Sequence, residues 1–159
     1  GEEVLSAASV KFRKRFPEIT VAIRAPADLL MIPMDAILIE QVLINLMENA
    51  ALHGETTTRV ELQLRREGSF ACFEVADNGN GIAPERLPLL FTGSLSASPK
   101  ESSDDKRNMG IGLSVCMTIV QAHGGTMEAR NRELGGALFC FKLPLEDEYY
   151  DDSRQDSDY

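Results

Sequence analysis

Apolar and polar positions alternate with a strand period near the start of the chain and with a helix period soon after. Residues 19–24 (ITVAIR) alternate like a strand, whereas residues 36–53 repeat apolar positions at helical spacing. Asp35 fits the N-cap of this helix, and Gly54 directly after it supplies a stop. The pattern therefore predicts a strand followed by a helix of about five turns.

Four more strand-like stretches form two neighbouring pairs. Residues 58–67 and 69–77 are rich in alternating apolar positions and are joined around Gly68. Residues 126–131 and 137–144 stand in the same way on either side of a Gly-Gly turn. The chain is thus expected to hold about five strands.

The remaining stretches comprise two helices and three polar or weakly patterned segments. Residues 109–125 predict a long helix with glycines at its start, and residues 84–91 a short helix opened by proline. Residues 92–108 are polar and Ser-rich, which predicts a mobile lid. Residues 1–18 have the pattern of a helix-like or linker-like N-terminal segment, and residues 146–159 form an acidic tail with a disordered composition.

This order of elements predicts one fold class. Residues 19–145 would form an α/β (α+β) two-layer sandwich, with a mixed sheet of about five strands and about three helices on one face. The length of 159 residues suits a single core, and 43% hydrophobic residues is ordinary for a globular domain.

Negative charge gathers at the C-terminal end of the chain. Residues 146–159 carry −6 of the net −9, so the predicted domain is only mildly acidic. A broad electrostatic grip on nucleic acid is therefore not expected, and a phosphate-bearing ligand must be held by local donors and a metal. No run reaches the ~18 apolar residues of a membrane span, and the first residues lack signal-peptide features. Because residue 1 is Gly, we expect a trimmed soluble piece of a larger protein.

The three cysteines, Cys72, Cys116 and Cys140, all lie in apolar segments. Their odd number and their spacing match no zinc or Cys-x-x-Cys pattern. They are predicted to be buried free thiols in a reducing compartment.

A polar stripe runs along the helix predicted for residues 36–53. Asn45, Asn49 and His53 fall within about 80° of one another on the helical wheel, with Glu48 at the edge. Two interpretations stay open, a solvated surface stripe or a ligand-facing stripe that holds a metal and phosphates. Asparagine oxygens suit Mg²⁺, which keeps several waters and takes few protein ligands.

Two glycine-rich segments are candidates for ligand contact. Asp77 ends an apolar strand and is followed by Asn-Gly-Asn-Gly, where a carboxylate could accept from the adenine amine, although such dipeptides also mark plain turns. Gly110 and Gly112 open the later helix, where free N–H groups and the helix dipole favour an anion. A lone Gly-x-Gly is by itself a weak signal.

The order of these pieces resembles the GHKL ATPase/kinase superfamily, which groups gyrase-type ATPases, a heat-shock chaperone, mismatch-repair ATPases and histidine kinases. EQVLINLMENAALHG looks like its N box, DNGNGI the first glycine box, LPLLF the F box and NMGIGLSV the second glycine box. HGGTMEARNRELGGALFCFKLP is similar to the C-terminal β-hairpin of histidine kinases. The resemblance covers about residues 19–145 and implies the two-layer fold of that superfamily.

Within the superfamily, the N box resembles that of histidine kinases. ATP hydrolases and the anti-sigma serine kinases of this fold place a Glu where Asn45 stands, whereas Asn45 together with Asn49 is typical of histidine kinases. VLINLMENA and NRELGGALFCFKLP are similar to the potassium-regulating KdpD-type sensor kinases. An anti-sigma-type serine kinase, suggested by NAALHG, is the first alternative.

The resemblance implies a role for each matched residue. Asn49 would ligate Mg²⁺, and the candidate catalytic residues Asn45 and Glu48 would line the phosphate side and position water or the incoming group. Asp77 would accept from the adenine amine, with Gly79 letting the purine lie close.

The other matched residues would surround the nucleotide. His53 would lie near it. Apolar walls near the base are implied for Ile82, Leu87 and Leu90. The remaining binding residues, the glycines and the backbone around the phosphates, are Gly81, Gly110, Ile111, Gly112 and Leu113.

The resemblance further implies a protein histidine kinase that uses ATP and Mg²⁺ as cofactors. It would donate the γ-phosphate to a histidine on a separate helical-hairpin phosphoacceptor domain of the same parent, with a response regulator as the indirect partner. The domain is expected in the cytoplasm and its parent among membrane-bound, dimeric sensors; nucleic acid is not an expected partner.

Four features depart from the family pattern. Leu52 stands where the N box usually has Lys, TGSLSA follows Phe91 where a second Phe and an Arg are usual, and Asn108 replaces a Gly. A phosphoacceptor motif is absent, since the histidines are His53 and His123 alone. Autophosphorylation of this chain alone is therefore not expected. The missing cations favour a second alternative, a catalytically weak nucleotide-binding or interaction module.

Overall fold

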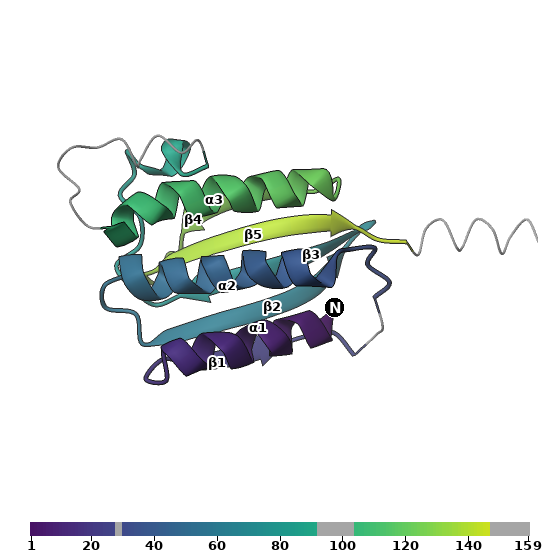
Figure 1. The fold of residues 1–159 in the computed structure, drawn as a ribbon, viewed down its shortest axis with the longest axis horizontal. Helices are drawn as coiled ribbons and strands as arrows, with labels where there is room; N and C mark the ends of the chain where they lie inside the picture. The colour runs from purple at the N-terminus through teal and green to yellow at the C-terminus, as the bar shows by residue number, and fades with distance from the viewer. Residues whose placement is uncertain (28–29, 92–103, 147–159) are drawn as a thin grey trace, which may run out of the picture.

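The computed structural model of the chain describes residues 1–27, 30–91 and 104–146, with the backbone alone for residues 104–111. Within these ranges a five-stranded sheet and three α-helices form two layers (Figure 1). In chain order the elements are α1 (Glu2–Arg15), β1 (Thr20–Arg24), α2 (Ala36–His53), β2 (Arg59–Glu67), β3 (Phe70–Asp77), the 3-10 helix η1 (Leu87–Leu89), α3 (Asp104–Ala122), β4 (Thr126–Asn131) and β5 (Ala137–Pro144). No helix in the described ranges is long and apolar enough to cross a membrane.

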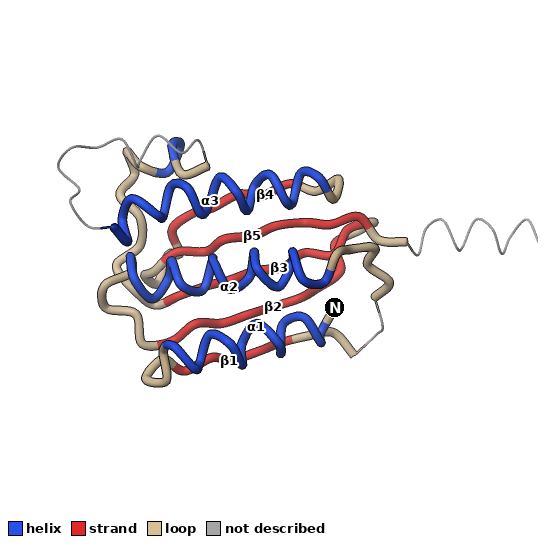
Figure 2. The backbone as a smooth tube through the Cα atoms, viewed as in Figure 1, coloured by secondary structure: helices blue, strands red, loops and turns tan. Residues whose placement is uncertain are grey.

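The sheet is mixed and its strands follow the order β1-β2-β3-β5-β4. β1 pairs parallel with β2, and the other neighbouring strands pair antiparallel. All three helices lie on one face of the sheet and run along its strands (Figure 2). The two-layer α/β sandwich predicted from the sequence is therefore confirmed.

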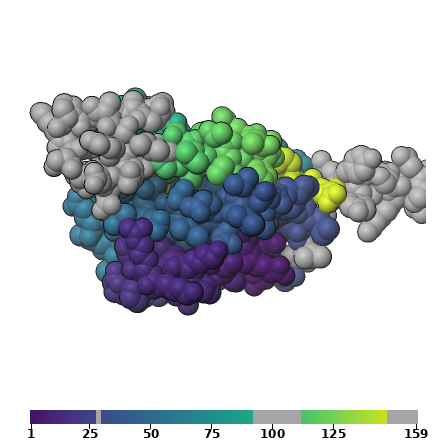
Figure 3. All heavy atoms as spheres, in the orientation of Figure 1, coloured from purple at the N-terminus to yellow at the C-terminus, as the bar shows by residue number. Residues whose placement is uncertain are grey.

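The core fills the space between the sheet and the helices. β2, β3 and β5 send every second side chain toward the helices, because successive side chains of a strand point to opposite faces. The rings of Phe73 and Phe141 stack there, with centroids 4.8 Å apart. In the space-filling view α1, α2 and α3 lie side by side across this face of the molecule (Figure 3). The opposite face of the sheet carries charged side chains of the same strands, among them Arg65, Glu74 and Lys142.

α2 occupies the centre of the helical layer. It begins where the Asp35 carboxylate accepts from the backbone N–H groups of Ile37 and Leu38, at 3.0 and 3.1 Å. Its apolar face packs into the core through Ile39, Val42, Leu43, Leu46, Met47 and Ala50. The helix ends at His53, as the sequence pattern predicts, and Gly54 follows as its C-cap.

α1 covers the part of the sequence expected to be helix-like or linker-like. It is a helix that packs against α2, and it buries Val4, Leu5, Ala8 and Phe12. These positions are spaced for one helical face, although small and charged residues between them weaken the pattern. Residues 2–15 thus complete the core of the domain that the sequence placed at residues 19–145.

Two elements differ from the predictions. The helix expected at residues 84–91 is a single 3-10 turn, η1. α3 begins at Asp104 and not at residue 109, since neither Pro nor Gly lies between residues 104 and 109 to stop it. Gly110 and Gly112 consequently lie inside α3 and not in its opening turn. The predicted lid therefore gives its last residues to α3, and its residues 92–103 lie outside the described part of the chain, as does the tail 147–159.

Candidate functional site

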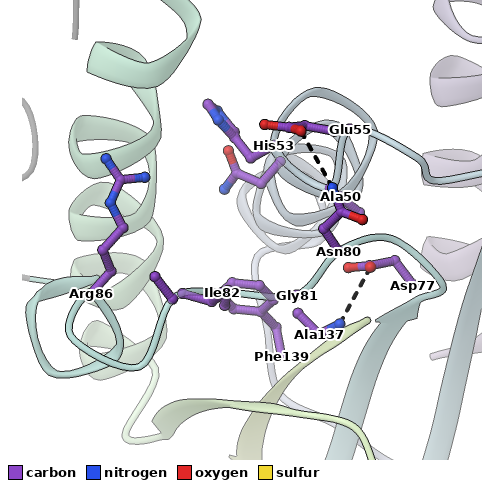
Figure 4. A pocket seen from close by; sticks show the side chains of 13 residues that line it. Ala50, His53, Glu55, Asp77, Asn80, Gly81, Ile82, Arg86, Ala137 and Phe139 are labelled. Atoms are coloured by element: carbon purple, nitrogen blue, oxygen red, sulfur yellow. Dashed lines mark hydrogen bonds between the residues drawn. The ribbon is translucent and has the colours of Figure 1, made fainter. Parts of the chain in front are cut away.

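A cavity of about 270 Å³ opens where α2 ends beside the glycine-rich loop after β3. The C-terminal turn of α2 supplies Asn49 and His53, β3 supplies Asp77 at its end, and β5 supplies Ala137 and Phe139. In Figure 4, His53, Glu55 and Asn80 lie on one side of the cavity and Arg86 on the other. The cavity therefore joins segments that are far apart in the sequence.

Asp77 is the buried charge of the cavity, with 3% of its surface exposed. Its Oδ1 accepts from the backbone N–H of Gly79 at 2.8 Å and of Ala137 at 3.3 Å. Burial raises the pKa of this carboxyl, while the two backbone N–H groups and the charge of Arg132 act in the opposite direction. An acceptor held in this way suits a ligand that brings a hydrogen-bond donor.

Glycines allow the loops behind Asp77 to touch. A Cβ at Gly136, whose φ is +88°, would come within 1.9 Å of the Asp77 carbonyl oxygen. A Cβ at Gly79 would meet Thr57 Oγ1 at 2.4 Å and the Gly54 carbonyl oxygen at 2.7 Å. Gly79 thus packs against the end of α2 and does not line the cavity, so its proximity to a purine stays a prediction.

Only part of the predicted polar stripe of α2 faces the cavity. Asn49 and His53 line it. Asn45 instead accepts from Gln41 at 3.2 Å, and its amide lies 3.7 Å from the Cys116 sulfur of α3. Glu48 faces α1, where it forms an ion pair with Arg15 at 2.6 Å. The catalytic roles predicted for Asn45 and Glu48 stay predictions.

The apolar residues of the prediction have separate places. Ile82 lines the cavity, whereas Leu90 is fully buried and Leu87 packs against the core. Leu113 is likewise a buried core residue of α3. Of the other predicted residues, Gly81 lines the cavity, whereas Gly112 lies in α3 and does not line it. For Gly110 and Ile111 the structure describes the backbone alone.

The structure adds residues that the sequence pattern did not single out. Glu55, Asn80, Arg86 and Phe139 line the cavity, and Asn80 donates to Glu55 at 3.3 Å. Arg86 supplies a cation near the cavity, between the segments resembling the first glycine box and the F box. Its position between two motifs was the available signal. Nothing local in the sequence marks Phe139, because it lies in β5 and only the pairing of the strands brings it to the cavity.

The turn between β4 and β5 holds the glycine-rich loop in place. The side-chain amide of Asn131 accepts from the Ile82 backbone N–H at 2.7 Å and donates to the Ile82 carbonyl at 2.7 Å. Arg132 donates to the Asp77 carbonyl at 2.7 Å. Asn131 and Arg132 therefore fix the backbone of two cavity residues without lining the cavity themselves.

The amide of Asn49 is an unsatisfied polar group at the edge of the cavity. Its Nδ2 is buried and has no hydrogen-bond partner among the described residues. An unpaired buried amide costs about 1–3 kcal/mol, so it is a natural place for a ligand to bind. No cluster of three His, Cys, Asp or Glu side chains that could hold a metal occurs in the described ranges. A metal here would depend on amide and ligand oxygens.

The sequence of the chain matches one known protein family over most of its length. The model of the family described as "Histidine kinase-, DNA gyrase B-, and HSP90-like ATPase" matches residues 34–147. The chain belongs to this family. It is a histidine-kinase-type ATP-binding catalytic domain, and the resemblance stated from its sequence boxes is confirmed.

Relatives within the family are sensor proteins. The chain is 39% identical to the sensor protein KdpD of Clostridium acetobutylicum over 145 aligned residues. The aligned region covers 91% of this chain and 16% of that protein. It is 38% identical over 119 residues to the sensor protein KdpD of Escherichia coli K12, covering 75% of this chain and 13% of that protein. The chain thus spans less than a fifth of these relatives.

Solved structures of the family share the fold. The catalytic domain of histidine kinase ThkA superposes with a TM-score of 0.70 at 27% identity, covering 89% of this chain and 90% of that one. Full-length ShkA in complex with AMPPNP superposes with a TM-score of 0.75 at 25% identity, covering 91% of this chain and 30% of that one.

Proposed function

We propose that this domain binds ATP with Mg²⁺ and donates the γ-phosphate to a histidine on a separate phosphoacceptor domain of a two-component sensor kinase. The observation that carries the proposal is the cavity itself. It brings Asp77, Asn49 and the glycine-rich loop to one hollow in a chain of the histidine-kinase-type ATPase family.

Adenine would be recognised by Asp77. A buried carboxylate accepts a hydrogen bond from the exocyclic amine of adenine, whereas guanine presents a carbonyl oxygen at the same ring position. A site built on such a bond discriminates strongly, because the wrong base leaves buried polar groups unpaired. Ile82 and Phe139 supply apolar surface beside it.

Phosphates and metal would lie toward Asn49 and Arg86. The buried Nδ2 of Asn49 is a donor without a partner and suits a phosphate oxygen, while the oxygen of the same amide is a suitable type of ligand for Mg²⁺. Bound Mg²⁺ would neutralise charge on the phosphates during transfer. Arg86 is placed to add a charge-assisted contact from the opposite side of the cavity.

The parent protein would supply the missing parts. The chain spans less than a fifth of its KdpD relatives. The phosphoacceptor hairpin and a response regulator are proposed because those relatives are sensor proteins, and a dimeric, membrane-bound parent is proposed from the sequence resemblance. The described part of this chain holds no helical hairpin that carries a phosphoacceptor histidine, and His53 and His123 are its only histidines.

Isothermal titration with ADP and GDP, each with Mg²⁺, tests the nucleotide site. We expect ADP to bind at least about a hundredfold more tightly than GDP, and Asp77→Asn to remove most of this preference. Glu128→Gln, the same carboxylate-to-amide change in the groove on the opposite face of the sheet, serves as the matched control and should keep the preference. Equal affinities for ADP and GDP would contradict the proposal.

A weak nucleotide-binding or interaction module is the second candidate. Leu52 favours it, since a leucine replaces the cation that the family usually places in the N box. The same titration separates the two. If neither ADP nor GDP gives a measurable heat of binding up to millimolar concentration, the interaction module is favoured.

A further inference from the structure

Two cysteines meet on the face of the sheet that points away from the helices. Cys72 of β3 and Cys140 of β5 are free thiols whose Sγ atoms lie 2.8 Å apart. Cys72 is fully buried, whereas Cys140 is partly exposed and lines a groove on this face beside Leu138 and Glu128. The nucleotide cavity uses neither residue.

The strand register places opposite charges around the two sulfurs. Cys72 stands directly between Arg65 of β2 and Lys142 of β5. Cys140 stands directly between Glu74 of β3 and Glu128 of β4. Neighbouring cations favour a thiolate and neighbouring anions favour a protonated thiol.

The pair is therefore polarised. The hydrogen bond from Cys140, opposed by burial and helped by the charge of Arg65, lowers the pKa of Cys72. The same hydrogen bond, together with burial and the carboxylates of Glu74 and Glu128, raises the pKa of Cys140. Deprotonation is thus easier at Cys72 than at Cys140, and one S–H···S contact joins the two sulfurs.

We propose that Cys72 and Cys140 form a dithiol modification site, which a small hydroperoxide oxidises to a disulfide linking β3 to β5. Cys140 is the sulfur that faces the groove, so it meets the oxidant first. Cys72 is the proton acceptor beside it and then the second sulfur of the bond.

The chemistry balances in two steps. The Cys140 sulfur attacks an oxygen of the hydroperoxide, its proton leaves by way of the adjacent Cys72 sulfur, and the O–O bond breaks to release an alcohol or water. Cys140 is then a sulfenic acid. The Cys72 sulfur attacks the Cys140 sulfur, and the departing hydroxyl leaves with the Cys72 proton as water. Two thiols lose two electrons, and the hydroperoxide gains both.

Cys116 provides a contrast within the same chain. It is fully buried in α3, on the other side of the sheet, and has no second thiol beside it. Burial raises its pKa to about 11, and its neighbours are Asn45 and the Val42 carbonyl. Because it is fully buried and has no second thiol to close a disulfide, Cys116 should stay reduced under conditions that oxidise the pair.

The test is a thiol count and an intact mass on the unfolded protein after treatment with hydrogen peroxide. We expect wild type and Cys116→Ser to lose two thiols and the mass of two hydrogens, with one cross-linked peptide joining Cys72 to Cys140. Cys72 and Cys140 are diagonal neighbours on adjacent strands, so a disulfide between them must shift one strand against the other and is strained. A strained disulfide is easily reduced, and dithiothreitol should therefore reverse the change.

Two single variants test the order of events. In Cys72→Ser, dimedone should trap a sulfenic acid on Cys140, formed at least about tenfold more slowly because the proton acceptor is gone. In Cys140→Ser, the buried Cys72 should stay unlabelled. Unchanged melting temperatures would show that both variants are folded.

Wild-type protein decides the proposal even if a variant does not fold. A dithiol that stays reduced at peroxide doses that oxidise free cysteine would overturn it. A disulfide that includes Cys116, or one that joins two chains, would overturn it equally.

Discussion

Asp77 is the residue at which the fold and the proposed recognition of adenine meet. Its carboxylate is nearly fully buried, and it is held by the N–H groups of Gly79 and Ala137. Burying an ionised carboxylate costs free energy unless it is hydrogen-bonded, and these bonds offset part of that cost. The balance still raises its pKa above the ordinary aspartate value of about 3.9. The same group should therefore make adenine binding sensitive to acid.

Acidification should weaken adenosine binding at a pH above the usual aspartate range. Since the ionised carboxylate is the acceptor, affinity is full above the Asp77 pKa and falls as the pH drops through it. The effect on the free energy of unfolding has the opposite sign. Because the pKa of Asp77 is raised in the folded state, its contribution to stability is fully present at low pH and is lost as the pH rises through that pKa. Titration with adenosine between pH 4 and 8, with Asp77→Asn as control, measures this. Equal pH profiles for both proteins would contradict it.

Leu52 is a half-buried residue at the end of α2 that does not belong to the packed core cluster. If this end of the helix faces phosphate, Leu52→Lys should tighten ATP about tenfold through a charge-assisted contact and leave adenosine unchanged. Leu52→Gln, which adds polarity without charge, is the matched control. A lower melting temperature without any gain for ATP would mean that Leu52 packs against protein.

At the scale of elements, the β4–β5 turn and the glycine-rich loop act as one unit. Asn131 mimics a strand partner of Ile82 by bonding both its N–H and its carbonyl, and Arg132 holds the Asp77 carbonyl. The loop thus gains the rigidity that a binding site on a loop otherwise lacks.

Asn131→Ala should weaken ADP about three- to tenfold, since two hydrogen bonds to the loop are lost and water replaces them in part. Calorimetry of ADP binding is the measurement. Arg130→Ala, on the same strand but facing the groove of the opposite sheet face, should leave ADP unchanged. A variant that melts earlier yet binds ADP normally would show that Asn131 serves stability alone.

α3 carries the second glycine box inside a continuous helix. Gly110 and Gly112 lie beyond the first four residues of α3, so their N–H groups serve the helix and are not free for an anion. If these groups bind phosphate, the first turns of α3 must rearrange when ATP is present. Hydrogen exchange should then change at residues 108–112 with ATP but not with adenosine. Identical exchange with both ligands would contradict this.

At the scale of the whole molecule, the proposed function makes the domain one half of a phosphotransfer reaction. The chain has the proposed nucleotide cavity but only two histidines, His53 and His123. His123 is engaged at the end of α3, where its Nδ1 contacts the Ile119 carbonyl and its Nε2 accepts from the backbone N–H of Asp35. Incubation of the chain with γ-labelled ATP should therefore give no acid-labile label. Acid-labile label on either histidine would refute the prediction. Addition of a phosphoacceptor hairpin from a KdpD relative is the positive control.

The sequence was most informative where residues close along the chain act together. The spacing of apolar residues predicted α2, β2 and β3 nearly to the residue, because periodicity is a local property. Asp35 and Gly54 marked the ends of α2 for the same reason. The start of α3 was predicted too late, since the polar residues before its glycines looked like a loop.

The sequence by itself determined the fold class, the family and the segments that form the cavity, because motif order and local periodicity carry this information. Only the tertiary structure decided which side of the α2 stripe faces the cavity, since α1 and α3 take up Glu48 and Asn45. It also decided the strand register that brings Cys72 to Cys140. Contacts of this kind join residues far apart in the chain, and no local pattern of side chains specifies them.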